Sequence, residues 1–189
     1  MSTAVIILIV IVAVVVVFGV TAMALRARGA QGSRGLRRRF GPEYERTVAR
    51  HDGDAKAAER ELAQRVERHG GLRERSLEPT EAERFEARWT AAQEHFVDAP
   101  REALGEADQL LADLARARGF PDGAQYEEQL SALSVHHAGR VQGYRHIHRV
   151  AHAPGDGAGT EEMREAMIEG RALFEELVGT SNRQHAERS

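Results

Sequence analysis

The sequence predicts an all-α protein with a single N-terminal transmembrane helix, followed by an antiparallel helical bundle or a set of helical hairpins. The first 28 residues include an uncharged apolar run. Beyond it, apolar residues recur three and four positions apart, as on one face of a helix, and Gly- and Pro-containing segments separate these stretches. The alternation of apolar and polar residues that indicates a strand is absent from the rest of the chain.

The apolar run covers residues 4–25, and 15 of its 22 residues are Val, Ile, Leu or Phe. At about 1.5 Å per residue, a helix of this length spans roughly 33 Å, which suits a hydrocarbon core about 30 Å thick. Many of these residues are β-branched, but a lone strand in lipid leaves its backbone polar groups unpaired. We therefore expect a helical membrane anchor over residues 1–28.

Charge asymmetry predicts the direction of this anchor. The segment before it carries no charged side chain, whereas six arginines follow it without an intervening acid: Arg26, Arg28, Arg34, Arg37, Arg38 and Arg39. Arginines beside a span favour the cytoplasmic side and are also attracted to anionic headgroups. The prediction is a cell-membrane protein with its N-terminus outside and its C-terminal domain in the cytoplasm.

A cleaved signal peptide is the alternative. Ala22-Met23-Ala24 has the small-x-small form that signal peptidase accepts, so cleavage after Ala24 would release the domain for export. However, no positive residue precedes the run, and the run is longer than the usual apolar region of about 7–15 residues. The arginines after the site would also resist translocation. These features favour the uncleaved anchor.

The rest of the chain divides into a basic Gly/Arg linker over residues 29–39, a helical domain over 40–178 and a disordered polar tail over 179–189. In the domain, a first helix is expected from Pro42 to about residue 53. Asp54 is expected to cap a second helix that ends at Gly70. Its apolar stripe of Ala58, Leu62 and Val66 is narrow.

The third and fourth expected helices carry the predicted core. Thr80 and Glu83 match a capping box at the start of the third. Its apolar face comprises Phe85, Trp89, Ala92 and Phe96. Asp98 is expected to cap the fourth helix, which continues to residue 119. A short helix around Tyr126, a histidine-rich helix over about 137–152 and a last helix capped by Thr160 complete the domain.

Composition excludes several classes of function. The chain has no cysteine, so disulfides, thiolate metal sites and cysteine nucleophiles are excluded. Residues 40–189 hold 20 basic and 29 acidic side chains, a net charge of −9. A nucleic-acid-binding domain usually carries a basic surface, so no nucleic-acid partner is expected. No P-loop, nucleophile elbow or Rossmann glycine motif is present, and neither enzymatic activity nor a cofactor is predicted.

Five of the nine histidines lie within residues 136–152. His148 and His152 stand four residues apart, a spacing at which two imidazoles on a helix can share a metal ion. The sequence indicates no third ligand and no HExxH motif. These two residues are therefore weak metal candidates, and the favoured interpretation of the histidines is solvation or packing.

Four short segments are distinctive as a set. They are residues 38–44 (RRFGPEY), the stretch from Arg88-Trp89 to Phe96-Val97-Asp98, residues 118–121 (RGFP), and residues 133–136 (LSVH) leading to Tyr144-Arg145. Together they resemble an uncharacterised actinobacterial family of short proteins, usually labelled hypothetical, membrane or secreted proteins. The resemblance covers roughly residues 37–178 and implies an N-terminal span plus a helical domain. The family has no established activity, so it supplies no functional residue.

Two functional hypotheses follow. The first is a single-pass, membrane-anchored interaction or scaffolding module at the inner leaflet, which binds a protein partner through its helical surface. The second is an exported helical protein, cleaved after Ala24, that binds a ligand or metal through its histidine-rich helix.

Overall fold

The structure is a computed structural model that describes residues 32–154 and 158–186, with side chains described as far as Gly179. The chain divides into two compact units, Met1–Arg39 and Phe40–Ser189. The predicted span over residues 4–25 lies outside the described residues. None of the described helices combines the length and the apolar character needed to cross a membrane.

The described part of the first unit, residues 32–39, is helical, although the sequence analysis expected a linker there. It contains four of the six basic residues that follow the predicted span: Arg34, Arg37, Arg38 and Arg39. The glycines at 32 and 35 lower helix propensity but do not prevent a helix. Arg26 and Arg28 lie outside the described residues.

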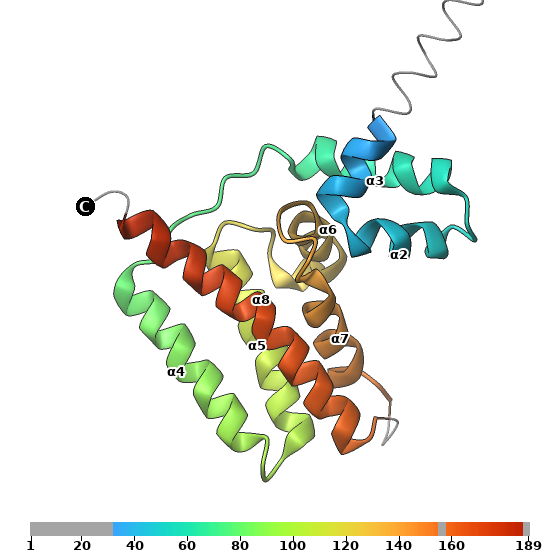
Figure 1. The fold of residues 1–189 in the computed structure, drawn as a ribbon. Coiled ribbons are helices and arrows are strands. Elements are labelled where there is room, and N and C mark those ends of the chain that lie inside the picture. The colour runs from blue at the N-terminus through green and yellow to red at the C-terminus, as the bar shows by residue number, and fades with distance from the viewer. Residues whose placement is uncertain (1–31, 155–157, 187–189) are drawn as a thin grey trace, which may run out of the picture. The chain divides into compact units, whose positions relative to one another are not determined.

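The described part of the second unit is helical and contains no strand, which confirms the all-α prediction. In chain order its elements are α2 (Pro42–Arg50), α3 (Ala55–His69), α4 (Pro79–His95), α5 (Pro100–Ala117), the 3₁₀ turn η1 (Gly123–Gln125), α6 (Tyr126–His136), α7 (Val141–Ala151) and α8 (Thr160–Ala186). Figure 1 shows their arrangement.

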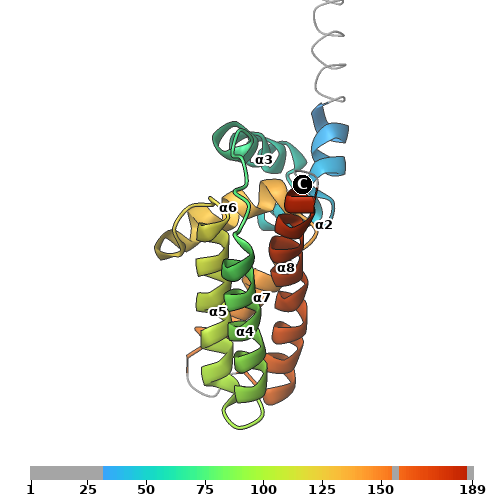
Figure 2. The ribbon, with the colours of Figure 1, turned by 90° about the vertical axis from the view of Figure 1, so that its left-hand side faces the viewer.

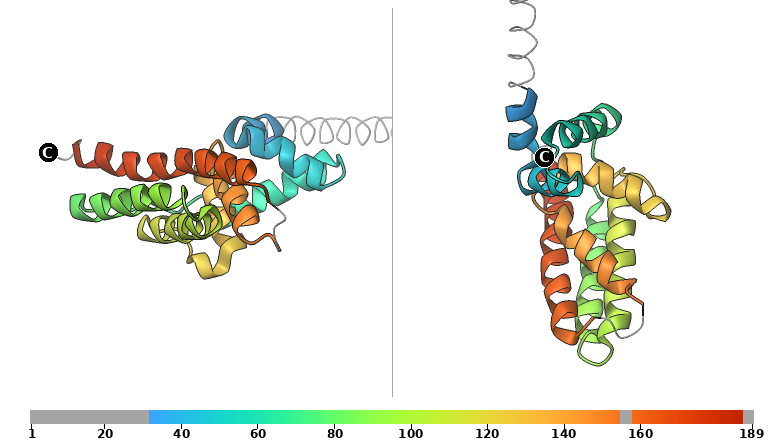
Figure 3. Two further views of the ribbon diagram at one scale, coloured as in Figure 1. Left: turned by 90° about the horizontal axis from the view of Figure 1, so that it is seen from below. Right: turned by 90° about the vertical axis from the view of Figure 1, so that its right-hand side faces the viewer.

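Helix α5 lies at the centre of this unit and contacts α4, α7 and α8. Helices α4 and α5 form an antiparallel hairpin, and α8 runs beside both of them, as Figure 2 shows. Helix α7 packs against α5 and α8, and α6 joins it to the α2–α3 hairpin (Figure 3). A bundle around α5 therefore carries α7, the helix that holds His146 and His148.

The core forms where the sequence predicted it. Phe85, Trp89 and Ala92 are buried on α4, and the Trp89 ring stacks on Phe174 of α8 with centroids 4.7 Å apart. Phe96 is only partly buried at the edge of this core. Because aromatic rings bury a large apolar area, this contact is a principal tie between α4 and α8.

Two glycines allow a close approach between α7 and α8. A Cβ atom on Gly143 would lie 2.1 Å from the Glu169 carbonyl oxygen, and one on Gly170 would lie 2.0 Å from Cδ1 of Ile147. Real side chains do not tolerate such distances, so a larger residue at Gly143 would push the helices apart, and one at Gly170 would displace the Ile147 side chain. The two glycines thus set the distance between the helices.

The segment between α3 and α4 has no regular structure and is fixed by charged groups. The buried Arg118 guanidinium donates to the Glu74 carboxylate at 2.6 Å and also to the backbone carbonyl of Arg75. His137 lies between two carboxylates, with Nε2 3.0 Å from Glu74 and Nδ1 2.6 Å from Glu176. The segment is therefore tied to α5, to the residue after α6 and to α8.

Three predictions about helix starts have different outcomes. Asp54 caps α3 as predicted, because its carboxylate accepts from the backbone N–H groups of Lys56 and Ala57. The caps predicted at Thr80 and Asp98 are wrong: α4 and α5 begin at a proline and have no side-chain cap. Proline at the first helical position has a fixed φ and no N–H that needs a partner, which explains both starts.

The later helix boundaries also differ from the prediction. The histidine-rich helix begins at Val141 rather than His137, because His137 is the C-cap of α6 and residues 138–140 form a turn before Val141 enters the core. Helix α8 continues to Ala186, through most of the segment predicted as a disordered tail. A single glycine such as Gly179 costs about 1 kcal/mol in a helix and need not end it.

Candidate functional site

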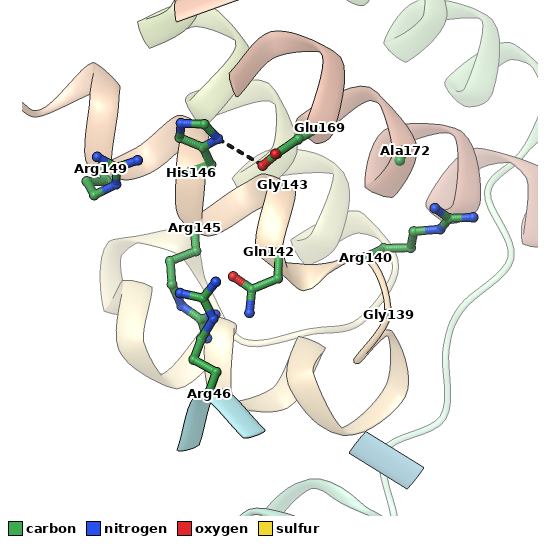
Figure 4. Close-up of a pocket in the computed structure, with 10 residues that line it drawn as sticks. All are labelled: Arg46, Gly139, Arg140, Gln142, Gly143, Arg145, His146, Arg149, Glu169 and Ala172. Carbon is green, nitrogen blue, oxygen red and sulfur yellow. Dashed lines mark hydrogen bonds and ion pairs between the residues drawn. The ribbon is translucent and has the colours of Figure 1, made fainter. Parts of the chain in front are cut away.

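Arginines line a pocket on the surface of α7, between α2 and α8 (Figure 4). The pocket has a volume of about 520 Å³. It is lined by Arg46, Gly139, Arg140, Gln142, Gly143, Arg145, His146, Arg149, Glu169 and Ala172. We call it the arginine pocket. Four of the lining residues carry a guanidinium group and one, Glu169, carries a carboxylate, in a domain whose net charge is −9.

Helix geometry brings these groups together. Gln142, Arg145 and Arg149 stand three and four residues apart on α7, so they share one face of the helix. The turn before α7 supplies Arg140, and α2 supplies Arg46 from a position about 100 residues earlier in the chain. The pocket thus depends on the contact between distant segments.

The four arginines differ in the ion pairs that they form with neighbouring carboxylates. Arg149 pairs with Glu162 at 3.0 Å and Arg140 with Glu176 at 3.4 Å, and both side chains are more than half exposed. Arg46 is exposed and makes no hydrogen bond or ion pair with the described residues. Exposed ion pairs contribute about 0–1 kcal/mol, so Arg140 and Arg149 can exchange their partners for an external anion at little cost.

Beneath the pocket lies Glu43 of α2, whose side chain is fully buried. Arg145 donates to both of its carboxylate oxygens, at 3.0 and 2.9 Å, and Gln142 donates to one of them at 2.8 Å. Arg65 of α3 also pairs with it at 3.1 Å. Glu43 therefore orients two of the groups that line the pocket.

The charged network continues away from the pocket through Arg65. This guanidinium also donates to Ser134 on α6 at 3.0 Å and to Glu61. Burial disfavours the charged form of Glu61, but hydrogen bonds from His51 and Arg65 outweigh it and lower the pKa of that carboxyl from 4.5 to about 2. Helices α2, α3, α6 and α7 are thus joined by one network of ion pairs and hydrogen bonds.

The structure brings the two predicted metal candidates together with a third residue. Nδ1 of His148 lies 2.9 Å from Oδ2 of Asp108, and Nε2 of His152 lies 3.1 Å from the same oxygen. Among the described residues, these three form a group whose donor atoms converge closely enough to hold a metal ion. The sequence analysis missed Asp108. An available signal was its position between Leu104 and Leu111 on the apolar face of α5.

Comparisons with protein-family models, with curated proteins and with solved structures found no match for this chain. The resemblance to an actinobacterial family stays a prediction.

Proposed function

We propose that this chain is a non-enzymatic, membrane-anchored interaction module whose arginine pocket binds an acidic segment of a protein partner. The single observation that carries the proposal is the convergence of four arginines on one pocket of an acidic domain. Guanidinium groups bind carboxylates in a bidentate manner, which gives such a surface both affinity and orientation.

The lining of the pocket supports a charged ligand over an apolar one. Small-molecule pockets are mostly lined by apolar and aromatic side chains with a few polar groups. Here Ala172 and the two glycines are the apolar contribution, and the other lining residues are charged or polar. Arg145 supplies a guanidinium group that Glu43 holds in place. Arg46 supplies an exposed guanidinium group that has no partner among the described residues.

Membrane attachment is proposed from the sequence. The uncharged run over residues 4–25 and the six arginines that follow it favour an anchor with the domain on the cytoplasmic side. Attachment would hold the pocket near the inner leaflet and so limit its partners to proteins that reach that surface.

Charge reversal tests the pocket in cells. Arg46→Glu and Arg149→Glu change two exposed side chains, so the fold should persist, and we expect the proteins recovered by crosslinking and co-purification with the full chain to fall at least tenfold. Arg84→Glu is the matched control, because Arg84 is an exposed arginine on α4 outside the pocket. Equal recovery with the pocket variants and the control would refute the proposal.

Mass spectrometry of the mature N-terminus separates the anchored form from the exported alternative. We expect a chain that begins at Met1 or Ser2 and stays with the membrane fraction. A chain that begins at Leu25 would show cleavage after Ala24 and export, and would contradict the proposed location.

A further inference from the structure

Asp108 lies in an unusual place for a carboxylate. It is on the face of α5 that packs against α7, and only about one-eighth of its side chain is exposed. A buried carboxylate is costly unless it is neutralised by hydrogen bonds, a counter-charge or a metal ion. Its partners in the structure are the imidazoles of His148 and His152.

The spacing of the donor atoms suits one metal ion. Ligand atoms bound to zinc at about 2.1 Å lie about 3.0–3.4 Å apart at octahedral or tetrahedral angles. Oδ2 of Asp108 lies 2.9 Å from Nδ1 of His148 and 3.1 Å from Nε2 of His152. These two distances lie close to that range, and the donor atoms of all three residues lie within 4.8 Å of one another.

The surrounding residues hold His148 in position. Its ring stacks on Tyr126 with centroids 3.6 Å apart and planes 12° apart, and Tyr144 packs against its edge at 6.4 Å. His152 follows one helical turn later, and its backbone N–H bonds to the His148 carbonyl at 3.1 Å. Two packed helices and a stacked ring thus orient the donors before an ion arrives, as binding sites require.

We infer that Asp108, His148 and His152 form a binding site for a divalent transition metal ion of the zinc type. Two imidazoles favour zinc, nickel, copper or iron over magnesium and calcium, which prefer oxygen ligands. Three protein ligands leave at least one coordination position, and because His152 is 62% exposed this position faces water. The inference does not depend on the arginine pocket.

Zinc titration of the full chain tests the site. The protein is purified in detergent without a histidine tag, treated with a chelator and titrated with ZnCl₂ alone. We expect one zinc ion per chain and a rise in Tm on saturation, because an ion that binds the folded state stabilises it. Cobalt should give the visible absorption of a coordinated ion, which a hydrogen-bonded cluster does not produce.

Variants assign the ion to these residues. His152→Gln changes a mostly exposed side chain, and Asp108→Asn keeps the size of the side chain, and each should weaken zinc binding at least tenfold. His95→Gln is the matched control, because the two ring nitrogens of His95 face separate carboxylates, Glu106 at 3.1 Å and Glu102 at 3.9 Å. Its affinity should equal that of the unmodified chain.

Two results would overturn the inference. One is the absence of saturable binding at one equivalent of zinc. The other is the same zinc affinity in His152→Gln, in the His95→Gln control and in the unmodified chain, which would place any bound ion elsewhere.

Discussion

At the scale of single residues, Glu43 is the most consequential charge in the domain. Its buried carboxylate holds Arg145 and Gln142 beneath the arginine pocket and pairs with Arg65 of α3. A buried ion pair is a weak source of net stability, but removing one member leaves the others without compensation. Glu43 therefore connects the stability of the fold with the geometry of the pocket.

Replacing Glu43 by Gln should lower the free energy of unfolding by about 3–5 kcal/mol, since it leaves two guanidinium groups without their buried counter-charge. Urea denaturation followed by the fluorescence of Trp89 measures this change. Glu45→Gln, on the exposed side of α2, is the control and should cost less than about 0.5 kcal/mol. A loss below 1 kcal/mol in Glu43→Gln would contradict the role given to Glu43.

A second group of residues makes stability depend on pH. Burial disfavours the charged imidazole of His137, but hydrogen bonds with Glu74 and Glu176 outweigh it and raise its pKa above 6.5. Burial also disfavours ionised Glu74, but His137 and Arg118 outweigh it and lower the pKa of its carboxyl from 4.5 to about 2. The charged forms of both groups stabilise the folded state.

The contributions of Glu74 and His137 to stability change in opposite directions as the pH rises. The contribution of Glu74 is complete above pH 4.5 and is lost as the pH falls toward 2. That of His137 is complete below pH 6.5 and is lost as the pH rises through its raised folded pKa. Both are complete between these values, so we expect this cluster to stabilise the fold most between pH 4.5 and 6.5.

His137→Gln should remove the loss of stability that begins above pH 6.5, whereas the His95→Gln control should keep it. Thermal unfolding measured from pH 4 to 9 gives both profiles. Parallel profiles for the two variants would show that His137 is not the group responsible.

At the scale of secondary-structure elements, the contact between α7 and α8 matters most, because α7 supplies half of the residues that line the arginine pocket, as well as His148. Gly143 and Gly170 set the distance of this contact. A methyl group at Gly143 would meet the backbone of α8, which cannot move aside as a flexible side chain can.

Gly143→Ala should destabilise the fold by at least about 1–3 kcal/mol, the usual cost of overpacking. Gly105→Ala is the control, because Gly105 is exposed on α5 and a Cβ there meets nothing within 4 Å. That change should be neutral or stabilise by up to about 1 kcal/mol, since alanine favours a helix. Equal melting temperatures of the two variants would refute the close contact.

The elements were largely predictable because their signals are local. Apolar spacing located most helices of the second unit, and Asp54 indicated the start of α3. The prediction that Thr80 and Asp98 cap helices was wrong, because proline at the first helical position removed the need for a side-chain cap. The predicted start of α7 was wrong because His137 is held by Glu74 and Glu176, two residues far from it in sequence.

The candidate sites were less predictable because they depend on packing between distant segments. Local spacing singled out His148 and His152, but Asp108 is 40 residues from His148 and approaches it only because α5 packs against α7. In the same way, the composition of α7 shows its arginines, but no local pattern places Arg46 beside them.

At the scale of the whole molecule, charge is unevenly distributed. Six arginines follow the apolar run, whereas residues 40–189 are acidic overall, and the arginine pocket lies within this acidic domain. An acidic domain is repelled by anionic headgroups and by nucleic acid, whereas the exposed guanidinium groups of the pocket can still attract an acidic segment. This arrangement supports the proposed protein partner.

Site-specific photo-crosslinking in cells tests this central claim most directly. A photoreactive residue replaces Ala172, a small residue that lines the pocket, in the full chain, and the control places it at Ala87, an exposed position on α4. We predict a discrete protein adduct from position 172, none from position 87, and loss of the adduct when Arg46→Glu is added. An adduct that persists with Arg46→Glu, or the absence of any protein adduct at position 172, would contradict the proposed partner site.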